Sequence, residues 1–379
     1  MADRIPAEVF PPGDFILEEL ESRGWTQIDL AEILGRPTQL VNEVVLGKRA
    51  ITPETAKGLA GAFGTSAQFW MNLQAAYQLS RIQDADDAVS RRAKVYAKAP
   101  IKELVRRRWI EPSQNIDVLE KRVLDFLNIK NLNDKPIVWA HALRKSTTYE
   151  SINQFQLAWM FRARRLARAI NATNFSNQSF DRGLESLRKL LQEPEDVRLV
   201  AKILADAGIR FLIVEHLPHT RIDGVCFWLD ETSPVIAISL RYDRIDWFWH
   251  TLMHEMGHVQ NRDGLKQDGR IDVDLVGEKA QDFKDKPESE KLVDNFASEF
   301  LIPKTELDGF MARVRPLYST ARINGFAKRL GIHPGIVVGQ LQHRNEIKYF
   351  ANRAMLVKIR NIVISSTLTD GWGNVALAV

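Results

Sequence analysis

The segment from residue 246 to residue 259 constrains this chain most, because a His-Glu-x-x-His motif at residues 254–258 interrupts an apolar helical pattern. Residues four apart share one face of a helix, so His254 and His258 can both direct an imidazole nitrogen at one Zn²⁺. Glu255 lies beside them, where it can take a proton from the attacking water and pass it to a leaving amine. The motif also arises by chance, so the flanking sequence has to support it.

Three segments upstream of the motif read as β-strands. They span residues 211–214, 224–229 and 235–240, and a turn at residues 230–234 joins the last two. We expect a small antiparallel sheet beside the active-site helix. A strand in that position can hold an extended peptide by main-chain hydrogen bonds.

A catalytic zinc site needs a third protein ligand, and the acidic residues downstream compete for that role. The candidates are Glu288, Glu290, Asp294 and Glu299. They lie on a predicted helix whose expected buried stripe is Leu292, Val293, Phe296, Ala297 and Phe300. Glu290 and Asp294 share one border of that stripe and Glu299 lies on the opposite border. We therefore favour Glu290 as the ligand and Asp294 as the group that orients a histidine, with Glu299 as the alternative.

His250 lies one helical turn before His254 and also invites assignment as a ligand. It stands about 12 Å along the helix axis from His258, so one ion cannot bind both. We expect His250 to be buried or to support the site indirectly.

The first 50 residues carry the pattern of two short helices joined at a glycine, which is typical of a helix-turn-helix. Thr26 is placed to cap a helix over residues 27–34, Gly35 ends it, and Pro37 suits the first position of the next helix, which ends at Gly47. We expect the outward polar residues of the second helix to read base edges, Gln27 to bind phosphate, and two basic residues to contact the DNA backbone. The residues expected to contact base edges are Thr38, Gln39 and Asn42, and the two basic residues are Lys48 and Arg49.

Length and composition complete the expected organisation. A chain of 379 residues with 45% hydrophobic and 26% charged residues is long enough for two or three globular domains. We predict a mostly helical α+β protein with a helix-turn-helix domain at 1–80, a helical connector at 81–195, a zincin-like domain at 196–310 and a helical extension at 311–379. The single cysteine, Cys226, and the lack of a long apolar run favour a cytoplasmic protein without membrane contact.

The N-terminal residues resemble known repressors. The segment 27–35 followed by Gly47-Lys48-Arg49 resembles the Xre/Cro family, and the segments 51–60 and 63–77 resemble HigA-type antitoxins. That resemblance implies binding to operator DNA as a homodimer, and raises a toxin as a partner. Pro37 departs from the serine that the family more often has at this position, which puts that phosphate contact in question.

The C-terminal half resembles the ImmA/IrrE metallopeptidases. The resemblance is carried by Phe248-Trp249, the motif at 254–258, and the segments 294–303 and 331–342. It implies a zinc endopeptidase that cleaves a regulatory protein such as a repressor, with the glutamate ligand at Glu290. Leu292-Val293 and His250 depart from the family's usual residues, which bears on substrate fit.

Two other readings stay open. In the first, the chain is a HigA-like antitoxin or repressor whose peptidase-like domain only binds a partner or signal. The presence of Glu255 argues against it, because binding alone needs no general base. In the second, zinc is structural, although such sites usually have four protein ligands and more cysteine than this chain has.

Overall fold

The computed structural model of the protein describes residues 9–81, 87–134, 153–263, 265, 271–273 and 287–372. The chain divides into two compact units, Met1–Ser90 and Arg91–Val379, which are described separately. None of the helices in the described ranges is long and apolar enough to cross a membrane.

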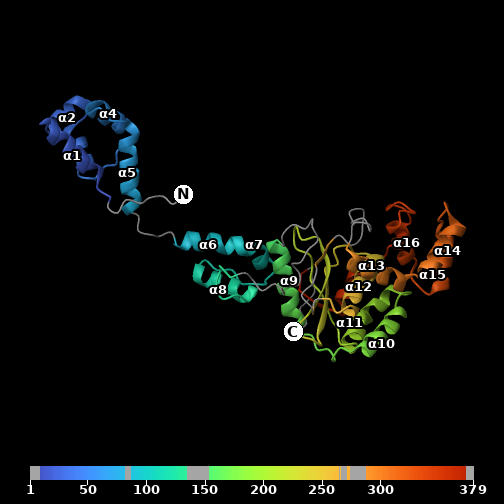
Figure 1. Ribbon diagram of the computed structural model, residues 1–379. Helices are drawn as coiled ribbons and strands as arrows, with labels where there is room; N and C mark the ends of the chain where they lie inside the picture. Colours follow the sequence, from blue (N-terminus) through green and yellow to red (C-terminus); the bar gives the residue numbers. More distant parts are fainter. Residues whose placement is uncertain are drawn as a thin grey trace. The chain divides into compact units, whose positions relative to one another are not determined.

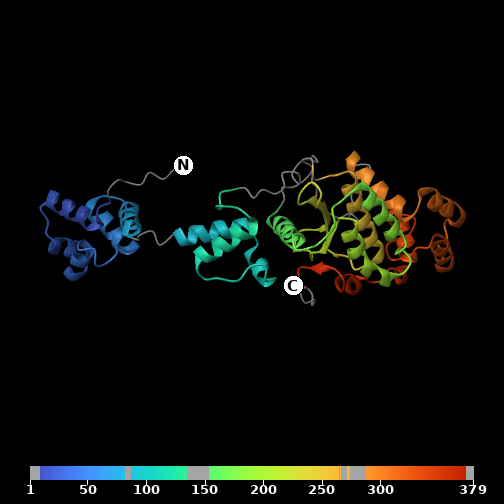
Figure 2. The ribbon, with the colours of Figure 1, turned by 90° about the horizontal axis from the view of Figure 1, so that it is seen from below.

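The first unit is a small bundle of helices (Figures 1 and 2). Its helices are α1 (Pro12–Arg23), α2 (Gln27–Leu34), α3 (Thr38–Val45), α4 (Pro53–Phe63) and α5 (Ala67–Arg81). They enclose an apolar core in which Leu30, Leu59 and Trp70 are almost completely buried. The all-helical N-terminal domain expected from the sequence is confirmed.

Local sequence explains where α2 and α3 begin and end. The Thr26 hydroxyl accepts the backbone N–H of Asp29 at 3.2 Å, and the Asp29 carboxylate accepts the backbone N–H of Thr26 at 2.7 Å. Hydrogen bonds from the Thr26 backbone and then from its side chain lower the pKa of Asp29. Gly35 ends α2 in the left-handed conformation, with φ of 59°. Pro37 directly precedes α3, one residue before the position that the sequence suggested.

The second unit is built around a five-stranded mixed sheet. Its strands are β1 (Arg210–Ile213), β2 (Ile222–Trp228), β3 (Pro234–Ile238), β4 (Ile271–Val273) and β5 (Leu368–Thr369), in the order β4-β2-β3-β1-β5. β2 is antiparallel to β3 and β4, but β1 is parallel to β3 and β5. The prediction of an antiparallel sheet is therefore wrong. β1 pairs with β3 instead of with β2, the next strand along the chain, and the segment after residue 311 contributes β5.

Helices account for most of the rest of the described chain, which confirms a mostly helical α+β protein. After α5 they are α6 (Asp87–Lys98), α7 (Ile101–Arg106), α8 (Ile116–Leu127), α9 (Gln154–Ala167), α10 (Asn177–Arg188), η1 (Pro194–Leu199), α11 (Val200–Asp206), α12 (Ile245–Gln260), α13 (Glu288–Leu301), α14 (Lys304–Val314), α15 (Thr320–Leu330), α16 (Pro334–His343), η3 (Arg353–Met355) and α17 (Arg360–Ile364).

The two faces of the sheet are covered by different helices (Figure 1). Alternate residues of β1 show this, because Leu212 packs in the cluster that includes Trp159 of α9, whereas Phe211 packs in the cluster that includes α12. The Trp159 indole N–H also donates to the Val214 carbonyl at 2.9 Å. Cys226 is buried on the α12 side.

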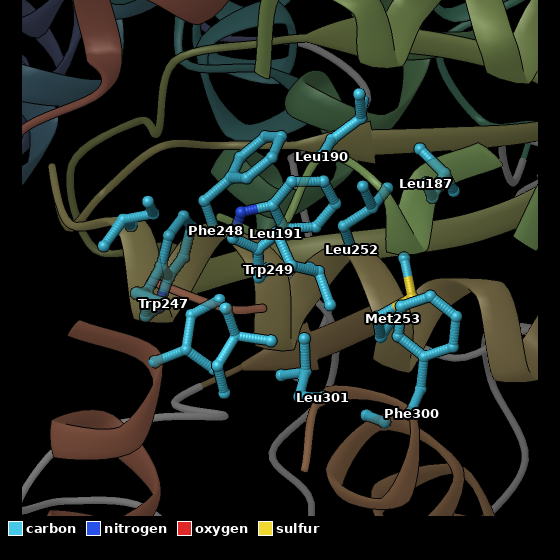
Figure 3. Close-up of a cluster of buried hydrophobic side chains, with 14 of the residues drawn as sticks. Leu187, Leu190, Leu191, Trp247, Phe248, Trp249, Leu252, Met253, Phe300 and Leu301 are labelled. Carbon is cyan, nitrogen blue, oxygen red and sulfur yellow. The ribbon is translucent and has the colours of Figure 1, made fainter. Parts of the chain in front are cut away.

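α12 is buried along almost its whole length because strands and helices surround it. Figure 3 shows Trp247, Phe248 and Trp249 of α12 packed near Leu190 and Leu191. Farther along the helix, Met253 lies near Phe300 of α13 (Figure 3), and Leu252 and Leu301 belong to the same buried cluster. This apolar packing holds the His-Glu-x-x-His segment inside the second unit.

A buried ionic cluster joins α7, the end of β1 and the region of β5. Arg107 donates to the Glu103 carboxylate at 2.7 Å, to the Glu215 carbonyl at 2.8 Å and to the Asp370 carboxylate at 3.3 Å. Burial raises the pKa of Glu215 to about 7, although its ion-pair partner Arg360 opposes the shift.

Candidate functional site

α12 and α13 bring together two imidazoles and one carboxylate. His254 Nε2 lies 3.2 Å from His258 Nε2, and Glu290 Oε2 lies 3.5 and 3.8 Å from these two nitrogens. All three residues are buried, and their candidate ligand atoms lie within 4.8 Å of one another. Within the described ranges, this triad is the only cluster of three or more histidine, cysteine or acidic side chains spaced to hold a metal ion.

The close approach of the two helices depends on Gly257. A Cβ at that position would lie 3.0 Å from Cβ of Val293 and 3.3 Å from the Phe296 ring. A glycine between the motif glutamate and His258 therefore lets α13 approach α12 closely enough for Glu290 to face the histidines.

Each histidine of the triad contacts a carboxylate through its Nδ1 atom, on the side of the ring away from the other histidine. His254 Nδ1 lies 2.9 Å from Asp294 Oδ1, and His258 Nδ1 lies 2.8 Å from Asp263 Oδ2. A carboxylate at Nδ1 favours the tautomer with its proton there, which leaves Nε2 unprotonated toward the shared point between the rings. The structure thus places Asp294 of α13 beside His254 of α12.

Asp263 lies outside the sequence motif and was not predicted to contact His258. It follows the end of α12, its backbone N–H donates to the His258 carbonyl at 2.9 Å, and its own carbonyl accepts the Trp228 indole N–H at 2.9 Å. The available signal was an aspartate five residues after the second histidine of the motif.

The buried face of α13 differs from the predicted stripe. Leu292 is 62% exposed, whereas Glu290 and Asp294 are 9% and 5% exposed. The inclusion of Leu292 was wrong because the helix turns its two carboxylates, and not an unbroken apolar stripe, toward the histidines of α12.

The other candidates for the third ligand lie elsewhere. Glu299 is exposed and accepts the backbone N–H of Lys304 at 2.9 Å, at the start of α14. Glu288 is exposed and pairs with Lys291 at 2.9 Å. His250 is half-buried, with its ring centre 6.4 Å from that of His254 and 6.0 Å from that of His343.

Glu255 is fully buried, and its carboxylate reaches the main chain of β2. A Cβ built on Gly224 would lie 2.3 Å from Glu255 Oε1. The side chain next to the first histidine of the motif therefore lies in a narrow space between α12 and the sheet.

The donor set fits a Zn²⁺ site of the catalytic type. Two imidazoles and one carboxylate are ligands that zinc takes in hydrolases, and a tetrahedral ion held by three protein ligands keeps a fourth position for water or substrate. Other divalent ions of similar size also bind such ligands, so the triad could hold a metal ion whose identity the ligands alone do not define.

The candidate DNA-reading residues lie on the surface of the first unit. Thr38, Gln39 and Asn42 are exposed on α3, Gln27 is half-buried at the start of α2, and Lys48 and Arg49 are exposed just after α3.

Glu43, which the sequence analysis did not single out, links two of these residues. Its carboxylate accepts a hydrogen bond from Gln39 Nε2 and another from Arg49 Nε, both at 3.0 Å. The signal was an acidic residue four positions after Gln39 on the same helix, which allows a side-chain pair.

Comparison with known proteins supports the assignment of the first unit. A helix-turn-helix family model matches residues 16–70. The uncharacterized HTH-type transcriptional regulator YddM of Escherichia coli K12 is 35% identical over 76 residues, which cover 20% of this chain and 81% of that protein.

Two solved structures are similar over about a fifth of the chain. The antitoxin HigA of Pseudomonas aeruginosa, solved with the higBA promoter, is 36% identical over 19% of this chain and 80% of that one, with a TM-score of 0.19. The protein PA4674 of Pseudomonas aeruginosa, solved in complex with its operator DNA, is 34% identical over 21% of this chain and 88% of that one, with a TM-score of 0.21.

Proposed function

Because this chain belongs to the helix-turn-helix family of transcriptional regulators, we propose that it couples operator binding to zinc-dependent cleavage of a regulatory protein. In this proposal residues 1–80 bind DNA as a homodimer, and residues 196–310 form a zincin-like endopeptidase. Residues 81–195 are a helical connector between these two domains, and residues 311–379 are a helical extension of the endopeptidase. The buried triad of His254, His258 and Glu290 beside Glu255 carries the peptidase part of the proposal.

The residues of the second unit divide the work of peptide hydrolysis among them. His254, His258 and Glu290 would hold Zn²⁺, which when bound supplies a Lewis acid that polarises the scissile carbonyl and activates water. Asp294 and Asp263 orient the two imidazoles. Glu255 takes a proton from the attacking water as its oxygen bonds to the carbonyl carbon, then gives that proton to the amine nitrogen as the C–N bond breaks.

The proposal on DNA binding rests on the exposed residues of α3 and on the relatives. We propose that Asn42, Gln39 and Thr38 contact base edges, because an α-helix fits the major groove and amide side chains pair with adenine there. Gln27, Lys48 and Arg49 contact the phosphate backbone, which positions the domain. The target we propose is the operator of the protein's own gene.

The metal content of the purified full-length protein tests the peptidase part first. We expect about one zinc per chain in wild type and in Glu255→Gln after exhaustive dialysis. Zinc-loaded wild type, but not Glu255→Gln, should then cleave a regulator encoded beside its gene, as followed by mass spectrometry.

Wild type that holds no zinc even after refilling would overturn the peptidase proposal. The second unit would then be a binding domain, and a HigA-like antitoxin or repressor would be the better account, consistent with the relationship of the first unit to HigA antitoxins. If zinc-loaded wild type does not cleave that regulator, the regulator is not its substrate, and other regulatory proteins are the next to be assayed.

A further inference from the structure

The main chain of β2 approaches the Glu255 side chain so closely that residue 224 has no room for a side chain. A Cβ on Gly224 would lie 2.3 Å from Oε1, 3.0 Å from Cδ and 3.1 Å from Cγ of Glu255. Carbon and oxygen atoms that are not bonded to each other repel steeply at 2.3 Å, since contacts become favourable only near 3.5 Å. Either Glu255 or the strand would have to move if residue 224 carried a methyl group.

Neither partner has an easy way to move. Glu255 is 0% exposed and lies on α12, which the sheet and α13 enclose. β2 is buried at every position and is hydrogen-bonded on both sides, to β3 and to β4. A substitution at residue 224 therefore acts on the carboxylate of Glu255.

The pairing of β2 with β4 is irregular just before Gly224. Ile222 pairs with Val273 and Gly224 with the adjacent Asp272, so Asp223 is an extra residue on the β2 side. Asp223 is completely buried, and its carboxylate accepts a hydrogen bond from Arg241 Nε at 3.0 Å. Its carbonyl accepts the Ser239 N–H at 2.9 Å. Bulges of this kind re-aim the residues of a strand and are frequent next to active sites.

We propose that Gly224 is a positioning residue for Glu255. Its missing side chain leaves the space that the carboxylate of Glu255, the residue after the first histidine of the triad, occupies against β2, and the bulge at Asp223 turns that space toward α12. A larger residue at 224 displaces the general base while the three metal ligands on α12 and α13 stay in place. This inference rests on the proposed peptidase function.

A double-mutant cycle on the full-length protein tests the contact without any substrate. Gly224→Ala should lower the Tm by roughly 5 °C, because overpacking a rigid site is destabilising. In the Glu255→Ala background the same substitution should lower the Tm much less, since the atoms it meets are gone.

Two other glycines serve as controls. A Cβ on Gly339 would lie 2.5 Å from the Asp246 carboxylate, so Gly339→Ala also crowds its site. This substitution should lower the Tm by the same amount in the wild-type and in the Glu255→Ala background. A Cβ on Gly325 meets nothing within 4 Å, and Gly325→Ala should not lower the Tm. An equal loss of Tm for Gly224→Ala in both backgrounds would overturn the proposal.

The second measurement asks whether Gly224 acts on the base and not only on stability. Co²⁺ is bound in place of zinc, and its visible absorption is followed against pH for wild type, Gly224→Ala and Glu255→Gln. We expect one Co²⁺ per chain in all three, and the midpoint of the Gly224→Ala transition should move in the same direction as that of Glu255→Gln.

The two experiments separate the two ideas. If the pH midpoint of the Co²⁺ absorption shifts in Glu255→Gln but not in Gly224→Ala, Gly224 affects only packing, and the inference is overturned. Wild type that binds no Co²⁺ would overturn the peptidase function, and the cycle would still decide whether Gly224 sets the place of Glu255.

Discussion

The two candidate sites are built in opposite ways. The candidate DNA-contacting residues of the first unit are exposed or half-buried and lie within 23 residues of sequence, from Gln27 at the start of α2 to Arg49 just after α3. The candidate metal site draws its residues from α12, α13 and the turn at Asp263, with β2 packed against Glu255. A surface reader therefore depends on few neighbours, whereas a buried site depends on the packing of the whole unit.

Removal of a metal ligand should separate the two sites most clearly. His254→Ala should lower the metal content of the purified protein from about one zinc per chain to almost none, because two ligands hold the ion far more weakly than three. Affinity for operator DNA should not change, since the readers lie on α3. Elemental analysis and fluorescence anisotropy measure the two quantities.

His343→Ala is the matched control for that substitution, because His343 is a histidine outside the triad. It should keep the zinc content of wild type. A His254→Ala protein that retains a full equivalent of zinc would refute the assignment of the triad.

The buried ionic cluster of the second unit should appear in the pH dependence of stability. The folded-state pKa of Glu215 is about 7, above its ordinary value of 4.5, so the folded protein keeps this proton to higher pH than the unfolded chain. The free energy of unfolding should therefore fall as pH rises from about 4.5 to 7, by up to about 1.4 kcal/mol per pH unit.

Glu215→Gln isolates that contribution, because its amide does not titrate. The difference in unfolding free energy between wild type and variant, from urea titrations at several pH values, should slope only between pH 4.5 and 7. A difference that is flat across this window would show that Glu215 has an ordinary pKa in the folded protein.

The carboxylates behind the histidines should have smaller effects than the ligands. Asp263→Ala and Asp294→Ala should each weaken zinc binding by about 10- to 100-fold, because the imidazole loses the partner that fixes its tautomer and orientation. Competition with a chromophoric chelator measures this affinity. Asp308→Ala, a control at a half-buried ion pair with Arg344 outside the triad, should bind zinc as wild type does.

The smallest effects are expected for the proposed DNA-contacting residues of the first unit, because each of these contacts acts almost independently of the others. Asn42→Ala should weaken operator binding by roughly tenfold and leave binding to unrelated DNA unchanged, because a base contact carries sequence information. Lys48→Ala should weaken binding to the operator and to unrelated DNA alike. The slope of affinity against salt concentration should decrease by about the amount expected for one phosphate contact. Equal losses of Asn42→Ala on both DNAs would show that Asn42 does not read bases.

Much of the fold and part of the candidate site follow from local sequence. Thr26, Gly35 and Gly47 mark the helix-turn-helix because capping and left-handed residues act on their immediate neighbours. The spacing of His254 and His258 places them on one helical face for the same reason. Strand segments were recognisable, but the partner of β1 was not, because strand pairing depends on the packing of distant segments.

The sequence by itself determined the helix-turn-helix of the first unit and the placement of two histidines on one helical face, since each depends on contacts within a few residues. Only the tertiary structure decided that α13 turns Glu290 and Asp294 toward α12 and leaves Leu292 exposed. It also decided that Asp263 holds His258, and that Gly224 of β2 lies against Glu255. These relations join residues on different elements, and the packing of α12 between the sheet and its neighbouring helices fixes them.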